Sequence, residues 1–133
     1  MINKTSSGNT LLARGLDATD IPRIDSAIKR FGDRFLQRIF TQGEITYCLK
    51  RRNTVPAFAA RFSAKEAAMK ALGTGHSNGI LWKDIEVVRF SGPPSLLFHR
   101  AAQRRLHALG AQTSFLTLTH SDELAMAQVV LLS

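Results

Sequence analysis

The sequence has one cysteine, few acidic residues and no long apolar run. Because Cys48 is alone, an intrachain disulfide and a zinc site built from several cysteines are excluded, and a reducing compartment, the cytoplasm, is expected. No apolar run approaches the roughly 20 residues of a membrane-spanning helix, and the opening MINKTSSGNT lacks the apolar segment of a secretory signal. These small polar residues predict a flexible tail or an expression remnant over residues 1–10, and residues 11–133 fit one domain.

Acidic residues are outnumbered, since 18 Lys and Arg stand against 10 Asp and Glu and give a net charge of +8. A charge this far from zero favours an anionic partner. Nucleic acid, a phosphorylated small molecule, an acidic protein and an acidic membrane surface all meet that condition, and the charge balance does not choose among them.

The spacing of apolar residues predicts three helices in the first half of the chain. Apolar residues three or four apart begin a helix after Asp20, which is an N-cap candidate. Thr41 and Glu44 fit a capping box that opens a short second helix. The third helix is the longest and is expected over residues 54–72, with Gly73 as its C-terminal stop.

Strands are expected at the start of the chain and through its second half. Apolar or alternating segments predict strands over residues 11–17, 85–90, 113–119 and 124–132, with a short further strand at SLLF and a helix over residues 99–109. Because helices and strands do not alternate strictly, the sequence predicts an α+β domain in which an antiparallel or mixed sheet packs on the long helix.

The segment RFSAKEAAMKALGTG, residues 61–75, places several charges on the long helix. Glu66 and Lys70 are four residues apart and share a face, and Arg61 and Lys65 form a second such pair. An exposed ion pair, worth about 0.3–0.5 kcal/mol, explains the spacing alone, and the spacing alone favours it. The other interpretation is a site for phosphate and metal.

Asp17 favours the second interpretation. It ends an apolar strand, where side chains project from the edge of a sheet into a crevice. It also suits a helix cap or a turn, but Asp20 competes for the cap. If Asp17 and Glu66 converge, they form the pair of carboxylates that Mg²⁺ prefers together with water and phosphate oxygens.

Cations and a flexible loop surround this predicted carboxylate pair. Arg61, Lys65 and Lys70 would neutralise phosphate charge, and the Gly-rich loop of residues 73–79 would permit close approach of a ligand. Such a set suits phosphoryl or phosphodiester transfer. His120 starts a turn at the end of a strand and is a further ligand-contacting candidate, whereas the other histidines are expected to be structural: His76, His99 and His107.

Three segments, GLDATDIPRI (15–24), RFSAKEAAMKALGTG (61–75) and LTLTHSDELAMAQVVL (116–131), resemble in order and spacing the bacterial holo-acyl-carrier-protein synthases, the small 4′-phosphopantetheinyl transferases. The resemblance covers nearly the whole domain. It implies transfer of the 4′-phosphopantetheine arm of coenzyme A to a serine of an apo-acyl carrier protein, with Mg²⁺ as cofactor and adenosine 3′,5′-bisphosphate as the by-product. It also implies a homotrimer with each active site between two subunits, and neither membrane nor nucleic acid as a partner.

The resemblance also implies roles for particular residues. Asp17 and Glu66 match the metal ligands, and with Lys70, expected near the diphosphate, they form the catalytic set. The residues expected to bind coenzyme A are Arg61, Lys65, Lys70, Gly73 and His120. The basic first helix would dock the acidic carrier through Arg23, Lys29 and Arg30. The sequence does not distinguish a fatty-acid carrier from a polyketide carrier.

One turn departs from the family pattern. The family has a Gly-Lys-Pro turn where this chain has SGPP, residues 91–94, so Pro93 stands in place of the lysine. If that lysine holds a phosphate of coenzyme A, either the affinity for coenzyme A is lower or Arg89 or Arg100 substitutes for the lysine.

The competing hypothesis for the whole chain is a basic, non-enzymatic module that binds nucleic acid or a carrier protein.

Overall fold

A computed structural model describes residues 10–75 and 77–133 of the chain. Apart from Thr10, the predicted tail over residues 1–10 lies outside the described residues, as does His76. The first strand begins at Leu11, where the predicted domain begins.

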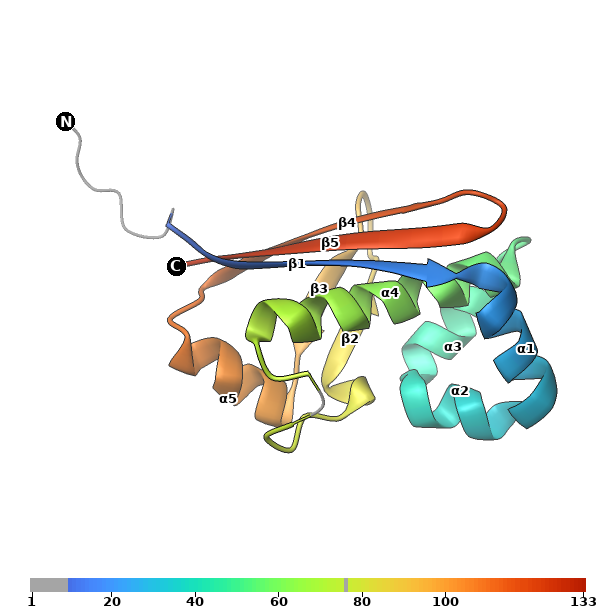
Figure 1. Cartoon of the computed structure of the whole chain (residues 1–133), viewed down its shortest axis with the longest axis horizontal. Helices are drawn as coiled ribbons and strands as arrows, with labels where there is room; N and C mark the ends of the chain where they lie inside the picture. Colours follow the sequence, from blue (N-terminus) through green and yellow to red (C-terminus); the bar gives the residue numbers. More distant parts are fainter. Residues whose placement is uncertain (1–9, 76) are drawn as a thin grey trace.

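The larger sheet has three antiparallel strands in the order β1-β5-β4 (Figure 1). They are β1 (Leu11–Asp20), β5 (Leu124–Leu132) and β4 (Thr113–His120). Burial alternates along β5, where the residues of one face, Ala125, Ala127, Val129 and Leu131, are buried. One face of this sheet therefore covers the core, while the other face lacks a covering element within the described chain.

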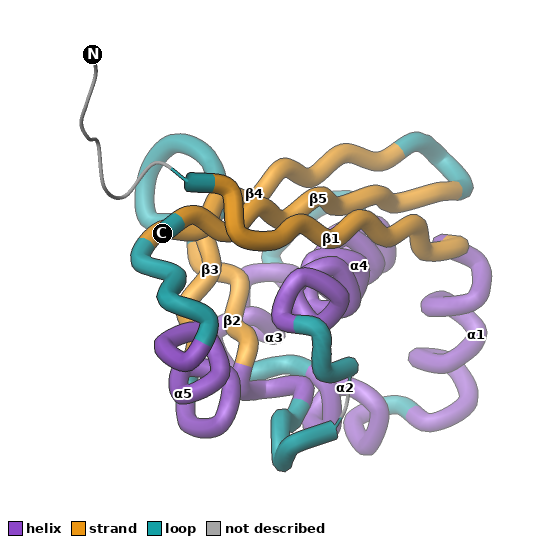
Figure 2. Tube along the Cα trace, turned by 60° about the vertical axis from the view of Figure 1, so that its left-hand side comes forward, coloured by secondary structure: helices purple, strands orange, loops and turns teal. Residues whose placement is uncertain are grey.

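The long helix α4 (Thr54–Leu72) packs against the inner face of the sheet, as Figure 2 shows. Its bounds agree with the prediction, and Gly73 ends it in the left-handed conformation at φ 77°. Most of α4 is buried because the sheet covers one side, and helices and a second sheet cover the others. Its buried apolar side chains include those of Phe58, Phe62, Met69 and Leu72.

Gly15 allows β1 to lie directly on α4. A Cβ atom at this position would stand 1.9 Å from the carbonyl oxygen of Ala67, which no side chain tolerates. The strand backbone therefore approaches the helix backbone closely at Gly15, and this approach sets the height of Asp17, two residues later, above α4.

Three shorter helices cover one end of α4: α1 (Ile21–Phe31), α2 (Asp33–Ile39) and α3 (Gln42–Leu49). The predicted capping box of Thr41 and Glu44 is confirmed. Asp20 occupies the N-cap position of α1, but its side chain makes no capping bond. The sequence predicted no separate α2, which begins because Gly32 turns the chain at φ 57°.

A second, two-stranded antiparallel sheet consists of β2 (Ile85–Val88) and β3 (Ser95–Phe98). It follows a 3₁₀ turn, η1 (Trp82–Asp84), and precedes α5 (Arg100–Ala108). The ring of Trp82 stacks on that of Phe62 at 4.9 Å, which ties this unit to α4. The chain is thus an α+β domain with antiparallel sheets on a long helix, as predicted.

Candidate active site

Asp17 connects β1 to α4. Its Oδ2 accepts hydrogen bonds from the hydroxyls of Thr19 and Ser63, both at 2.9 Å, and Ser63 also donates to the backbone carbonyl of Asp17 at 3.0 Å. Its Oδ1 forms an ion pair with Lys70 Nζ at 3.1 Å. The carboxylate, 12% exposed, is therefore held against the helix at two points one to two turns apart.

Glu66 lies on α4 between these two points. It follows Ser63 by three residues and precedes Lys70 by four, so all three lie on one side of the helix. Its side chain is partly exposed. The ion pair between Glu66 and Lys70 that the spacing favoured is not formed, because Lys70 binds Asp17 and the carbonyl oxygen of Leu16 at 3.0 Å. Asp17 and Lys70 are thus in contact, and Glu66 lies on the same side of α4 as Lys70, whereas the convergence of Asp17 and Glu66 on a metal ion stays a prediction.

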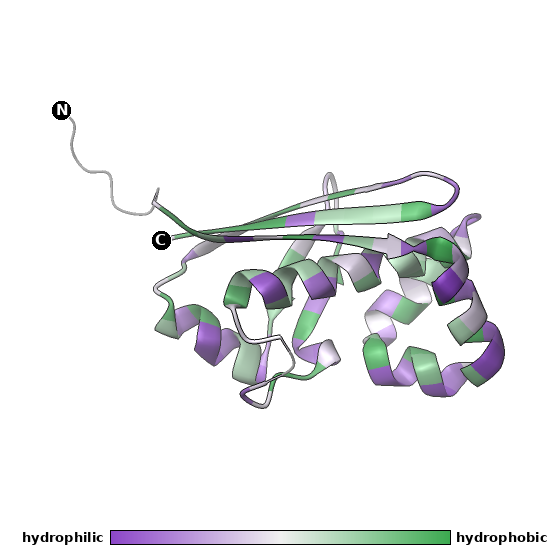
Figure 3. Cartoon of the chain, viewed as in Figure 1, coloured by the Kyte–Doolittle hydropathy of each residue, from purple (hydrophilic) through white to green (hydrophobic). Residues whose placement is uncertain are grey.

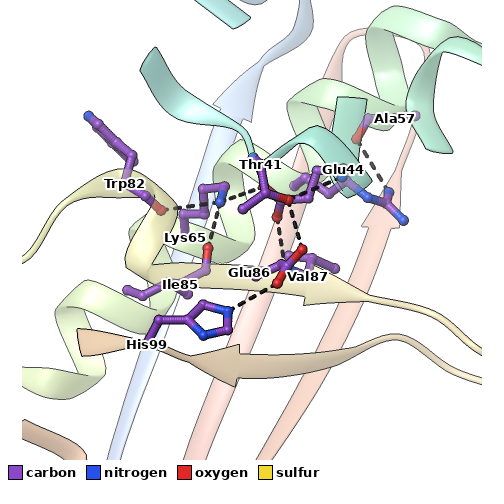
Figure 4. Close-up of polar contacts among 10 residues, drawn as sticks. Thr41, Glu44, Ala57, Lys65, Trp82, Ile85, Glu86, Val87 and His99 are labelled. Carbon is purple, nitrogen blue, oxygen red and sulfur yellow. Dashed lines mark hydrogen bonds and ion pairs between the residues drawn. The ribbon is translucent and has the colours of Figure 1, made fainter. Parts of the chain in front are cut away.

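Lys65 points to another side of the helix and is fully buried. Its ammonium pairs with Glu44 at 2.8 Å and donates to the carbonyls of Trp82 and Ile85, as Figure 4 shows. Burial lowers the pKa of Lys65, and the carboxylate of Glu44 opposes that shift. The predicted phosphate contact of Lys65 therefore needs correction, because a ligand does not reach a side chain without exposed surface.

The buried pair continues into a polar network toward the small sheet (Figure 4). Glu44 also accepts from the backbone N–H of Val87 at 2.7 Å. Beside it, Glu86 accepts from the hydroxyl of Thr41 at 2.8 Å and lies 3.0 Å from His99 Nε2. These contacts join α3, α4 and β2, and they agree with the structural role expected of His99.

Arg61 and His120 line a common cavity of about 260 Å³. The guanidinium of Arg61 lies 4.2 Å from the centre of the Tyr47 ring, and Nη1 donates to the carbonyl of Ala57 at 3.5 Å. Its Nε is buried and has no partner among the described residues. Three further arginines line the same cavity: Arg51, Arg52 and Arg89. Such a cavity suits a phosphate group.

The two sets of residues lie on different sides of α4. Arg61 precedes Ser63 by two residues, which is a rotation of roughly 200° around a helix. At the sheet, Asp17 belongs to β1 and His120 to β4, and β5 lies between these strands. One chain therefore carries two separate sets of predicted site residues, named here the Asp17 half (Asp17, Glu66 and Lys70) and the Arg61 half (Arg61 and His120).

The remaining predicted residues are Gly73 and three cations of α1. Gly73 is the exposed C-cap of α4, and its N–H binds the carbonyls of Met69 and Lys70. Three predicted cations of α1 are exposed, namely Arg23, Lys29 and Arg30. Figure 3 shows that this helix carries many hydrophilic residues. Lys29 pairs with Asp25 at 2.9 Å.

Cys48 is buried in α3, and burial raises the pKa of its thiol to about 12. A thiol with so high a pKa stays protonated at neutral pH and is a poor nucleophile. Cys48 is therefore an ordinary buried residue of α3.

Four polar residues were missed in the sequence. Ser63 and Thr19 bind the Asp17 carboxylate, and Arg51 and Arg52 line the Arg61 cavity. Ser63 stands three residues before Glu66, and Thr19 shares a strand face with Asp17, so periodicity contained a signal for both. The two arginines carry no such signal, because the connection between α3 and α4 places them.

The sequence profile of the 4′-phosphopantetheinyl transferase superfamily matches residues 13–129. The chain belongs to this superfamily, within its bacterial holo-acyl-carrier-protein synthases. It is therefore an enzyme of the transferase class. The holo-[acyl-carrier-protein] synthases of Koribacter versatilis and Solibacter usitatus are 48% and 43% identical to it, each across 91% of this chain and 98% of the relative.

Solved structures of the same family have the same fold. The holo-[acyl-carrier-protein] synthase of Neisseria meningitidis has a TM-score of 0.84 at 28% identity, over 92% of this chain and 98% of its own. The Bacillus anthracis synthase, in complex with CoA (3′,5′-ADP), has a TM-score of 0.75 at 32% identity, over 92% and 97%. The Helicobacter pylori synthase, in complex with coenzyme A, has a TM-score of 0.77 at 27% identity, over 90% and 99%.

Within the described part of the chain, no helix is both long and apolar enough to cross a bilayer. The cytoplasmic location stays a prediction. The same residues contain no cluster of three or more His, Cys, Asp or Glu side chains placed as metal ligands.

Proposed function

We propose that the chain transfers the 4′-phosphopantetheine arm of coenzyme A to a serine hydroxyl of an apo-acyl carrier protein. The serine oxygen would attack the β-phosphorus, and the bond to adenosine 3′,5′-bisphosphate would break. The names of the relatives and the coenzyme A complexes support this reaction. The observation that carries it is the Asp17 carboxylate, which Ser63 and Lys70 hold against the side of α4 that also carries Glu66.

The donor set of this half fits Mg²⁺. Mg²⁺ takes one or two carboxylates and keeps positions for water and phosphate oxygens. Asp17 and Glu66 supply two carboxylates on one side of α4, and the partial exposure of Glu66 leaves that side open to a ligand. We assign these two residues as the ligands of a Mg²⁺ ion, which would neutralise negative charge on the diphosphate.

The cations of the chain would position the substrate. Lys70 is 54% exposed, so its ammonium can leave Asp17 and bind a diphosphate oxygen. Arg61 is held against Tyr47 and lines the cavity with His120, and the two would bind phosphate or ribose of the nucleotide. Holding the reacting groups in line supplies much of the rate of phosphoryl transfer.

Arg89 is proposed to replace the lysine that the SGPP turn lacks. Its side chain lines the cavity of Arg61 and His120, and its Nε donates to the carbonyl of Gly92 at 2.8 Å. Arg100, the other candidate, binds both carboxylate oxygens of Asp84 at 3.1 Å and does not line that cavity.

A homotrimer would unite the two halves of the site. Because α4 and β5 separate the Asp17 half from the Arg61 half within one chain, a ligand contacting both is best accommodated between two copies. The uncovered face of the larger sheet offers a surface for assembly, since several large apolar side chains are exposed there. They include Leu16, Phe115, Leu124 and Met126.

The basic face of α1 is proposed to dock the carrier protein. Arg23 and Arg30 are exposed, and Lys29 pairs only with the neighbouring Asp25 among the described residues. Such exposed cations would attract an acidic partner and speed its association, with an effect that falls at high salt.

The mass of a carrier protein tests the proposed reaction. Incubation with coenzyme A, Mg²⁺ and an apo-carrier should add one phosphopantetheine group, and Asp17→Asn and Glu66→Gln should each abolish the gain while the unfolding temperature stays near wild type. No mass gain across fatty-acid and polyketide carriers would overturn the function. In that case salt-dependent nucleic-acid binding would favour the non-enzymatic hypothesis.

A further inference from the structure

The two oxygens of Asp17 have different environments. Oδ2 accepts two hydrogen bonds, from Thr19 and Ser63, and these hydroxyl-bearing residues are 2% and 0% exposed. Oδ1 meets only the ammonium of Lys70 among the described polar groups, and that side chain is 54% exposed. Oδ2 is therefore fixed from inside the protein, whereas Oδ1 faces an exchangeable partner.

The donors to Oδ2 are neutral. A buried cation in their place would neutralise Asp17 and weaken its attraction for a metal ion. Hydroxyl groups hold the carboxylate without cancelling its charge. Ser63 adds a hydrogen bond to the backbone carbonyl of Asp17, so the same hydroxyl lies close to the main chain and the side chain of one residue.

We propose that Thr19 and Ser63 are positioning residues, which fix Oδ2 of Asp17 and turn Oδ1 toward the cation that it binds. The inference rests on the proposed role of Asp17 as a metal ligand. Lys70 occupies Oδ1 in the metal-free protein and exchanges for the divalent cation, while the two hydroxyl groups keep the carboxylate plane in place. Neither Thr19 nor Ser63 contacts the substrate.

The affinity for Mn²⁺, used as a paramagnetic probe, separates positioning from simple packing. Hydrogen bonds to a metal-binding carboxylate are commonly worth 10- to 100-fold in metal affinity. Thr19→Val, which keeps the shape of the side chain and removes the hydroxyl, should weaken Mn²⁺ binding about 10-fold, and Ser63→Ala should do the same. Titrations followed by electron paramagnetic resonance, with and without coenzyme A, give the dissociation constants.

A matched variant serves as the control. Thr19→Ser keeps the hydroxyl and should leave the Mn²⁺ affinity within about 2-fold of wild type. A packing role predicts the opposite order, with Thr19→Val near wild type and Thr19→Ser weakened because the methyl group is lost. Chemical unfolding of each variant shows whether it is folded. If Thr19→Val does not fold, Ser63→Ala alone decides the question.

The variant Asp17→Asn distinguishes a failure of the positioning role of Thr19 and Ser63 from a failure of the metal-ligand role of Asp17. If Asp17→Asn loses Mn²⁺ binding while Thr19→Val and Ser63→Ala keep wild-type affinity, the positioning role is overturned and the metal site stands. If Asp17→Asn itself keeps wild-type affinity, Asp17 is not a ligand and both assignments fail. Loss of affinity in all three variants, with recovery in Thr19→Ser, supports the inference.

Discussion

At the scale of single residues, Lys65 and Lys70 differ although they stand five positions apart on one helix. The side chain of Lys65 has no exposed surface and pairs with Glu44, whereas that of Lys70 is 54% exposed and pairs with Asp17. Five residues are a rotation of about 140° around a helix, so the two ammonium groups point to different surroundings. The first stabilises the packing of α3 on α4, and the second is available to a ligand.

Replacing Lys65 tests its structural role. Lys65→Met leaves Glu44 as an unpaired buried charge and should lower the free energy of unfolding by about 3–5 kcal/mol. The double variant Lys65→Met/Glu44→Gln removes both charges and should recover much of that loss. Urea unfolding measures both. Equal stability of the single and double variants would contradict a coupled pair.

Arg89 and Arg100 form a matched pair for the question of the missing lysine. Arg89→Ala should raise the KM for coenzyme A about 10-fold, equivalent to about 1.4 kcal/mol, because it removes a cation from the nucleotide cavity. Arg100→Ala should leave that KM near wild type, since Arg100 binds Asp84. Steady-state kinetics with varied coenzyme A decide between them, and an effect of Arg100→Ala alone would reverse the assignment.

Features that depend on local periodicity were easier to predict from the sequence than pairings between residues distant along the chain. Asp17, Glu66 and Lys70 were proposed together from an expected strand end and from helical spacing, which depend on local periodicity, although β1 continues to Asp20 and Asp17 lies within it. The pairing of Lys65 with Glu44 was not predicted, since it joins residues that are 21 positions apart through tertiary packing. The two-residue spacing of Arg61 and Ser63 already predicts that their side chains point to opposite sides of the helix. The separation of Asp17 from His120 by β5 depends on the strand order, which the sequence did not predict.

At the scale of elements, the contact of β1 with α4 depends on the absence of a side chain at Gly15. A Cβ at position 15 would lie 1.9 Å from the carbonyl oxygen of Ala67, so only glycine fits where β1 crosses this turn of α4. Gly15 therefore fixes which residue of β1 lies over which turn of the helix. The Gly-x-Asp pattern in the sequence therefore has a physical basis, because the glycine brings the strand down and the aspartate then reaches Ser63.

Gly15→Ala should be destabilising by about 1–3 kcal/mol, because the strand must move away from the helix. The shift should also lower the rate of phosphopantetheine transfer, since Asp17 moves with the strand. Gly43→Ala is the control, because a Cβ there makes an ordinary 3.4 Å contact with Glu86. Thermal unfolding and carrier mass gain give the two readouts, and a neutral Gly15→Ala would exclude the close approach.

The elements themselves were predicted unevenly. The bounds of α4 were correct because Gly73 is a strong stop signal, and those of the final strand were correct because its alternation is long. The helix α2 was missed, since Gly32 divides a segment whose apolar spacing is continuous. The strand β1 runs to Asp20 rather than Asp17, because pairing with β5 extends it beyond its apolar residues.

At the scale of the whole molecule, one face of the larger sheet has polar and apolar side chains and no covering element in the described chain. Its exposed apolar residues include Phe115 at 58% and Met126 at 37%. An apolar surface of this kind is covered in many proteins by another copy of the chain.

The double variant Phe115→Glu/Met126→Glu should convert the proposed trimer into a monomer, because it places charges in a desolvated interface. Light scattering coupled to gel filtration measures the mass. Leu49→Glu serves as the control, since Leu49 is 59% exposed on α3, away from the sheet. A monomeric wild-type protein would overturn the trimer, and a trimeric double variant would place the interface elsewhere.

Because β5 is the central strand of the larger sheet, that sheet cannot form until the C-terminal end of the chain has been synthesised. β1 carries Asp17 and emerges early, but its sheet partner is β5, and residue 11 pairs with residue 132. Until β5 is synthesised, β1 has no strand to pair with, and its contact with α4 at Gly15 is not reinforced by the sheet. The helices of the nascent chain therefore precede the sheet that holds Asp17 against α4, and this arrangement is complete only when the last strands have been added.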